Sequence, residues 1–264
     1  MNHLVSDSLT IMRRNIIKIR RVPDLLVFTT LQPIMFVLLF GFVFGALAPG
    51  DPRGYREFLL AGVFAQTVVF GGTFTGYGMA EDMQKGVIDR FRTLPMHPGA
   101  VLAGRTLSDV VNNTISLVVM ALTGLIIGWR IRDGVLGALI AFALLLLFAY
   151  AVSWIMAWVG LKVRSPEVVG NASFMVIFPL TFIANTFVPS QSLPTVLRVM
   201  AEWNPVSAVT EAARQRFGNT SDKMPTSDAW PLQNPELATL GWSAILLIIF
   251  VPLAIRQYQK AVSR

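Results

Sequence analysis

Six long apolar runs constrain this chain more than any other feature of its sequence. They lie at residues 25–47, 58–80, 110–128, 134–160, 168–189 and 237–255. Each is close to the ~20 residues that a helix needs to cross a bilayer. Because lipid offers no water to an unpaired backbone group, segments this long and apolar are expected to cross as helices. The sequence therefore predicts an all-α membrane protein with six transmembrane helices.

Ionisable residues are missing from the middle of all six runs. A charge at mid-bilayer costs about 3 kcal/mol or more, and ion-coupled pumps and membrane enzymes accept that cost because their chemistry requires it. Asp109, near the inner end of an expected span, comes closest to such a residue. We therefore expect a conduit or scaffold whose driving force comes from elsewhere.

The stretches between the runs are too short to form a soluble domain. The longest is 190–236, and charged residues make up 14% of the chain, against about a quarter in soluble proteins. We expect a single transmembrane domain over residues 1–264, with an interfacial segment at 1–24 and an outer segment at 190–236. A nucleotide-binding domain does not fit in this length.

The net charge of +7 is explained by membrane topology rather than by a nucleic-acid partner. Basic residues of membrane proteins collect in cytoplasmic loops. With the N-terminus inside, 14 of the 22 Lys and Arg residues fall on the inner side. The distribution predicts a multi-pass protein of the cell (inner) membrane with both termini in the cytoplasm.

Residue types needed for several kinds of chemistry are missing. The chain has no cysteine, and His3 and His97 lie in different polar segments, so no metal site is expected. It also lacks the G-x-x-x-x-G-K-[ST] phosphate loop and the G-x-S-x-G nucleophile elbow. We expect no catalytic residues and no cofactor in this chain, which is therefore not an enzyme by itself.

A basic amphipathic helix is expected over residues 3–22. Leu9, Met12, Ile16 and Ile19 recur at helical spacing among basic residues, and Pro23 ends the helix. Such a helix beside a span is expected to lie in the inner headgroup layer, in contact with membrane lipids. A simple positively charged anchor explains the same residues equally well.

A second amphipathic helix is expected on the cytoplasmic side after the second run, over residues 81–95. Met83, Val87 and Phe91 recur every four residues, and Pro95 ends the segment. A solvated connector is the alternative, but a connector does not require an apolar stripe. The stripe favours a helix that docks in a groove of a soluble protein.

The outer segment is divided by proline. We expect two short amphipathic helices that are separated at Pro205, and they could either dip into the outer leaflet or cap the bundle. Trp129, Trp154 and Trp158 are interpreted as interfacial anchors. The pair Gly72 and Gly76 predicts close helix packing, either within the chain or between two copies.

Two blocks of residues carry a resemblance to a known family. The first has an acid, a glycine, a proline and a Gly-Arg pair after the second run, and the second runs from Asn-Pro to Glu-Ala-x-Arg. In order, these residues are Glu81, Gly86, Pro95, Gly104, Arg105, Asn204, Pro205, Glu211 and Arg214. With both blocks inside six runs, nearly the whole chain resembles permeases of the ABC type-2 exporter family, most closely its daunorubicin-resistance-like branch.

The resemblance implies a permease half that pairs with a second copy or a close paralogue. Two cytosolic ABC ATPase subunits would bind the pair and would hold ATP and Mg. Residues 81–95 would be the coupling helix, the N-terminal helix would be a second ATPase contact, and spans one, two and five would line the path. The implied coupling residues are Glu81, Met83, Gly86, Val87, Asp89, Arg90, Phe91, Arg92 and Pro95.

The leading functional hypothesis is outward transport of a hydrophobic or amphipathic drug, lipid or glycolipid. Aromatic side chains with sparse polar groups suit such a ligand, although packing within the bundle explains each of them as well. The alternative is a self-sufficient secondary transporter or channel, which would need intramembrane carboxylates or unwound helices. The candidate substrate-path residues are Gln32, Gln66, Phe70, Phe74, Asn171, Phe178, Phe182 and Asn185.

Overall fold

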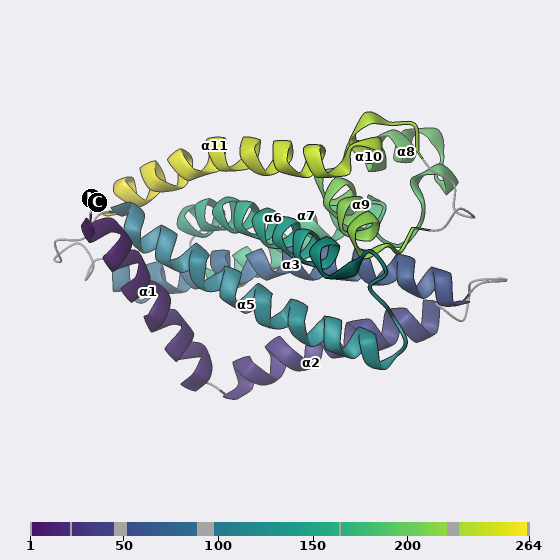
Figure 1. The fold of residues 1–264 in the computed structure, drawn as a ribbon. Coiled ribbons are helices and arrows are strands. Elements are labelled where there is room, and N and C mark those ends of the chain that lie inside the picture. The colour runs from purple at the N-terminus through teal and green to yellow at the C-terminus, as the bar shows by residue number, and fades with distance from the viewer. Residues whose placement is uncertain are drawn as a thin grey trace.

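The computed structural model describes residues 2–21, 23–44, 52–88, 98–163, 165–220 and 227–262, and these residues form helices and connecting turns without a strand. Figure 1 shows their arrangement. The helices are α1 (Asn2–Arg21), α2 (Pro23–Leu39), the π-helical η1 (Phe40–Phe44), α3 (Pro52–Gln84), α5 (Pro98–Ile126), α6 (Gly134–Lys162), α7 (Pro166–Ile183), η2 (Ser190–Ser192), α8 (Thr195–Glu202), α9 (Pro205–Phe217), α10 (Trp230–Gln233) and α11 (Pro235–Val262).

Five of the described helices are long and apolar enough to cross a membrane: α3, α5, α6, α7 and α11. The first expected span, 25–47, overlaps α2, which begins two residues earlier, and includes η1; within them Leu31–Val43 is a shorter apolar helix. Residues 45–51 lie outside the described part of the chain. The prediction of an all-helical protein with several apolar helices of membrane-spanning length is confirmed.

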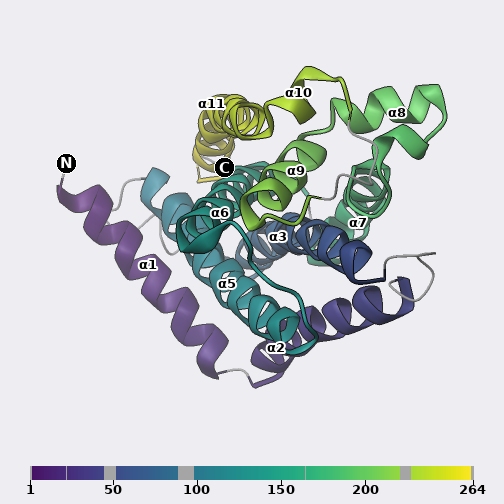
Figure 2. The same ribbon diagram turned by 45° about the vertical axis from the view of Figure 1, so that its right-hand side comes forward.

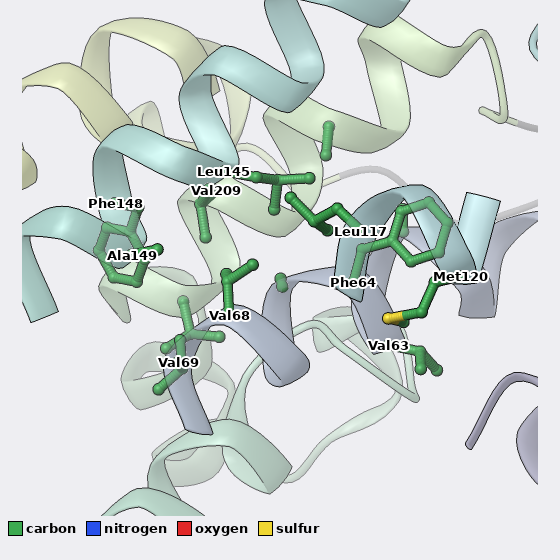
Figure 3. Packing of buried hydrophobic residues seen from close by; sticks show 14 of the residues in the cluster. Val63, Phe64, Val68, Val69, Leu117, Met120, Leu145, Phe148, Ala149 and Val209 are labelled. Carbon is green, nitrogen blue, oxygen red and sulfur yellow. The ribbon is translucent and has the colours of Figure 1, made fainter. Parts of the chain in front are cut away.

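Helix α3 lies at the centre of the bundle. In its most apolar window 72% of the residues are buried, against 28% in α7 and 22% in α11. Its side chains pack against those of α5, α6, α7 and α9, which surround it. Figure 3 shows this core, with Val63, Phe64, Val68 and Val69 from α3, Leu117 and Met120 from α5, Leu145, Phe148 and Ala149 from α6, and Val209 from α9.

Glycines bring α3 and α6 into backbone contact. A Cβ atom on Gly160 of α6 would overlap the carbonyl oxygen of Gly76, and one on Gly72 would lie 2.8 Å from the Val152 side chain. Small residues at this spacing allow close approach of helices where no hydrophobic driving force holds them together. Of the two uses considered for Gly72 and Gly76, the structure shows packing within the chain.

Two helix boundaries differ from the prediction. Residues 81–84 form the last turn of α3, which spans Pro52–Gln84 rather than 58–80, and a turn follows at Lys85 and Gly86. The prediction of a separate helix that begins at Glu81 is therefore wrong. Residues 89–97 lie outside the described part of the chain. Helix α5 begins at Pro98, twelve residues before the expected 110. Its early polar residues find partners inside the protein, so they do not end the helix.

Two of the three tryptophans interpreted as interfacial anchors are buried. Trp129 packs edge-to-face against Phe64 and Phe217, and its indole N–H donates to Asn219 Oδ1 over 2.7 Å. Trp154 is also buried. A tryptophan beside a turn can either cover the end of the hydrophobic core or lie at the membrane interface. Trp129 covers the core. The interpretation of Trp129 and Trp154 as anchors is wrong.

Helix α1 runs obliquely to the long helices and packs on the first part of α5 (Figures 1 and 2). Its end at Arg21 agrees with the stop predicted at Pro23, the first residue of α2. The start of α1 and the end of α11 lie at the same end of the bundle (Figure 1). The opposite end carries α8, α9 and α10, where the predicted break at Pro205 separates α8 from α9.

Candidate functional site

A row of stacked phenylalanines lies on the exposed side of α7. Phe174, Phe178 and Phe182 recur every four residues, so one face of the helix carries all three. They are 57%, 38% and 42% exposed, with ring centroids 5.0 and 4.1 Å apart. The ring contacts continue from Phe182 to Phe187, whose ring is tilted against it, and Phe187 stacks on Phe40 of η1. We call Phe174, Phe178 and Phe182 the aromatic row.

Residues of α3 lie beside this row. The Phe70 ring centroid is 6.3 Å from that of Phe174, and Phe74, one turn further along α3, is 52% exposed. Phe174 was not among the candidate residues, although its spacing of four from Phe178 was visible in the sequence. The arrangement offers an apolar, half-exposed surface that is shared between α3 and α7.

The candidate path residues divide into exposed and buried sets. Gln66 is buried in α3, where its Oε1 finds no hydrogen-bond donor among the described residues. Asn185 is also buried, and it joins a polar network described below. The structure leaves Phe70 half-buried and exposes Gln32, Phe74, Asn171, Phe178 and Phe182.

The Asn185 network is centred on Arg214 of α9, which is 2% exposed. Its guanidinium pairs with Glu211, donates to the Asn185 carbonyl oxygen over 2.9 Å, and lies 3.6 Å from the centroid of the Phe58 ring. Asn185 Nδ2 donates to Glu211 as well, and the Asn185 backbone N–H donates to Ser207 Oγ. Burial lowers the pKa of Arg214, and the Glu211 carboxylate opposes that shift.

This network connects α9 to α3 and to the segment that follows α7. A buried charge is tolerated when its partners satisfy it, and here those partners come from three separate segments. Gly62 of α3 completes the contact, because a Cβ atom there would overlap the Thr186 carbonyl oxygen. The second family block therefore contains residues that hold the fold together at this end.

Local capping residues fix the ends of α9. The Asn204 side chain accepts from the Val206 N–H at the N-terminus, and its Nδ2 donates to the Leu180 carbonyl oxygen over 2.8 Å. Pro205 occupies the first helical position, where the missing N–H costs nothing. Gly218 ends the helix with a φ of +68°, which glycine adopts without strain.

The Gly-Arg pair of the first block joins α5 to two neighbours. A Cβ atom on Gly104 would lie 2.5 Å from the Ser8 carbonyl oxygen of α1. Arg105 Nη2 donates to the Phe74 carbonyl oxygen over 3.0 Å, and its guanidinium lies where a Cβ atom on Gly78 would be. One turn later, Asp109 accepts from the Thr75 hydroxyl. Polar side chains of α5 thus have partners on α3.

The candidate coupling segment is described only as far as Ile88. Glu81 pairs with the exposed Lys85, and Asp82 pairs with Arg14 of α1. Met83 packs partly against a buried cluster that includes Ile88, so the first member of the predicted stripe faces the protein interior. Gly86 forms the turn and Val87 is half-buried. The remaining candidates, Asp89, Arg90, Phe91, Arg92 and Pro95, lie outside the described residues.

Within the described part of the chain, no three His, Asp or Glu residues gather in a way that could hold a metal ion. The half-exposed rings of α3 and α7 make their shared apolar surface the main candidate site.

Comparison with known proteins points to one family. The sequence profile of the ABC-2 type transporter family matches residues 7–217. The daunorubicin resistance ABC transporter permease protein DrrB1 of Streptomyces coeruleorubidus is 34% identical over 97% of this chain and 87% of its own length. The probable doxorubicin resistance ABC transporter permease protein DrrC of Mycobacterium tuberculosis is 24% identical over 87% and 79%. A putative transport permease, ycf38 of Cyanophora paradoxa, is 22% identical over 93% and 85%.

Proposed function

Because the chain belongs to the ABC-2 type transporter family, we propose that it is the permease half of an exporter for hydrophobic or amphipathic molecules. A separate ATPase subunit would supply the energy. The half-exposed aromatic row of α7, with Phe70 of α3 beside Phe174, is the observation that carries this proposal. Largely apolar surfaces with a few polar groups suit such ligands. Relatives named for daunorubicin and doxorubicin resistance support a drug as the substrate class.

Two permease halves would form the transport path between them. A second copy or a close paralogue, placed against α2, α3 and α7, would enclose the aromatic row together with Gln32 and Asn171. Apolar rings would bind the body of the substrate, and the two amides would bind its polar groups. Gln66 and Asn185 are assigned to the interior of one half rather than to the path, since both are buried.

Energy would come from two cytosolic ABC ATPase subunits that hold ATP and Mg, because this chain has no phosphate loop of its own. Closure of the ATPases on ATP would move the segment 81–95 and switch the paired halves between inward and outward access. The ion pair of Arg14 with Asp82 supports a shared movement of α1 and the end of α3.

We further assign six spans, with α2 and η1 as the first, and both termini to the cytoplasmic side of the inner membrane. The excess of basic residues in the expected inner loops supports this topology. It is also supported by the position of the start of α1 and the end of α11 at one end of the bundle (Figure 1). The short helices α8 and α9 would then lie on the outer side.

Ion-coupled transport by this chain alone has less support. It would need a carboxylate that exchanges protons or binds ions. Asp109, the carboxylate nearest to this requirement, is buried and accepts a hydrogen bond from Thr75. Its position explains how α3 and α5 are held in register, so it does not call for a coupling ion.

The composition of the complex tests the proposal. The purified chain alone should hydrolyse no ATP, and co-expression with its ATPase should give a complex of two permease chains and two ATPase chains by mass measurement. ATP turnover by the isolated chain, or a complex with a single permease chain, would contradict the proposal.

The docking role of residues 81–95 has its own test. Phe91→Ala should weaken ATPase binding about thirtyfold, because truncation of an interface anchor typically has an effect of that size. Lys85→Ala is the matched control, since Lys85 is exposed and pairs with Glu81 of its own chain. The measurement is a pull-down of the ATPase from membranes that hold equal amounts of each variant. If Phe91→Ala bound the ATPase as well as the wild-type chain does, residues 81–95 would be a connector and not a docking segment.

A further inference from the structure

Arg105 is a charged residue within α5, a helix that is long and apolar enough to cross a membrane. It lies seven residues after Pro98, where α5 begins, which is about 10 Å along the helix axis. Ionisable residues inside spans are rare because they are costly, and they either pair with other protein groups or mark a binding path. The contacts of Arg105 show which explanation applies.

The partners of Arg105 within the described residues do not use up its donors. Its Nη2 donates to the Phe74 carbonyl oxygen over 3.0 Å, whereas its Nε finds no acceptor among those residues. The Asp109 carboxylate, four residues later, offsets the charge of Arg105, but it is buried and its hydrogen bond comes from Thr75 of α3. A guanidinium carries five N–H groups in a planar fork, so its accessible N–H groups can bind an oxygen of another molecule.

Gly78 makes room for this guanidinium on α3. A Cβ atom on Gly78 would overlap the Nη2 and Cζ atoms of Arg105. Gly78 lies one turn after Phe74, so both residues belong to one face of α3, and the half-buried Arg105 side chain lies against that face. Helix packing therefore fixes the position of the guanidinium, and an alanine at residue 78 would displace it without removing its charge.

The surface of α3 beside the guanidinium is aromatic and exposed. Phe74 is 52% and Tyr77 45% exposed, and their spacing of three residues makes them neighbours on the helix surface. Phe70, one turn before Phe74, contacts Phe174, the first residue of the aromatic row. A line of apolar rings therefore leads from Arg105 along α3 to α7. A positive group at one end of a long apolar surface is complementary to an amphiphile with an anionic head.

We propose that Arg105 binds the anionic head of amphiphilic substrates, whose apolar body lies along Phe74, Phe70 and the aromatic row. This inference rests on the proposed function, because it assigns that surface to the substrate. In the proposed topology Arg105 lies near the cytoplasmic end of its span, at the depth of the head of a molecule in the inner leaflet. Charge-assisted hydrogen bonds would select and orient the head, and the rings would bind the body.

A matched pair of probes tests this recognition of charge. The probes are a dansyl-labelled alkyl sulfonate and the dansyl-labelled alcohol of the same chain length, so they share one apolar body. Their affinities for the full-length chain in phosphatidylcholine nanodiscs are measured by fluorescence, with empty nanodiscs subtracted. The wild-type chain should prefer the sulfonate. Arg105→Gln should lower the ratio of the two affinities about tenfold, the effect expected of one hydrogen bond to a charged group, whereas Arg105→Lys should retain a preference.

A second variant tests the position of the guanidinium rather than its presence. Gly78→Ala keeps Arg105 but fills the space that its guanidinium occupies, so it should also lower the affinity ratio. Gly241→Ala in α11, where the new methyl group meets open space, is the matched control. Arg198→Gln in α8 controls for the loss of one positive charge. Both controls should keep the wild-type ratio, which does not depend on the amount of folded protein.

An unchanged ratio in Arg105→Gln or in Gly78→Ala would overturn the inference. So would equal weakening of both probes in Arg105→Gln, because the residue would then only shape the surface. These measurements need neither the ATPase nor transport. If the wild-type chain binds both probes without a preference, the inference about Arg105 fails and the proposed export function stands. If it binds neither probe, the proposed path along α3 and α7 fails as well.

Discussion

The Arg214 network of α9 and the aromatic row of α7 lie in neighbouring parts of the molecule and have opposite properties. Arg214 is almost fully buried, and every partner that holds it comes from the same chain. The rings of Phe178 and Phe182 are about 40% exposed and stack on each other. The Arg214 network holds segments of the fold together. The aromatic row remains partly exposed and is available to contact another molecule.

The difference follows from the cost of each arrangement in a membrane protein. An arginine that loses water must have its partners in place, so the residues around it are tightly constrained. A phenylalanine exposed to lipid costs little, because acyl chains are as apolar as the protein interior. Substitutions in the Arg214 network should therefore lower stability, whereas substitutions in the aromatic row should lower transport.

The largest expected effect is on stability at Arg214. Arg214→Ala leaves the Glu211 carboxylate without its ion-pair partner and with the Asn185 Nδ2 hydrogen bond alone, which should cost about 3–5 kcal/mol of unfolding free energy. Arg216→Ala in the same helix is the matched control, since it removes a partly exposed ion pair with Glu236 of α11. Denaturant unfolding of the detergent-solubilised chain measures both. Equal stability of the two variants would remove the distinction between the regions.

A smaller loss is expected at Gly62. Gly62→Ala forces a Cβ atom onto the Thr186 carbonyl oxygen, a backbone atom that cannot move alone, and overpacking of this kind costs about 1–3 kcal/mol. Gly170→Ala in α7 has open space around it and should be neutral or slightly stabilising. The same unfolding assay applies. A neutral Gly62→Ala would mean that α3 and the chain after α7 are less tightly joined than the structure shows.

The smallest of the three stability effects is expected at Asn204. Asn204→Ala removes the cap of α9 and the bond to the Leu180 carbonyl oxygen, and should cost about 1–2 kcal/mol. Asn204→Asp keeps the cap but loses the donor, so it should fall between wild type and Asn204→Ala. If Asn204→Asp were as stable as wild type, the contact with Leu180 would contribute nothing.

Features governed by local chemistry could be predicted from the sequence. Pro23 stops α1, and Asn204 with Pro205 starts α9, because caps and prolines act on their own immediate neighbours. The all-helical class followed from the length and apolarity of the runs. Each of these conclusions needed nothing beyond a window of adjacent residues.

Features governed by contacts between distant segments could not be predicted. Helix α3 is apolar on most sides, so periodicity did not show that Gln66 turns inward while Phe74 turns outward. Asn185 looked like an isolated amide in a span, because its partner Glu211 is 26 residues away. The buried position of Trp129 depends on Phe217 and Asn219 in the same way.

The most direct test of the central claim is drug efflux by a variant that lacks two rings of the aromatic row. Phe178→Ala combined with Phe182→Ala should lower ATP-dependent efflux of daunorubicin or doxorubicin about tenfold, on an estimate of somewhat under 1 kcal/mol for each lost aromatic contact. Ile248→Ala, at a 74% exposed position on α11, is the control. Cells with equal amounts of folded permease and ATPase are compared. Wild-type efflux by the double variant would contradict the account.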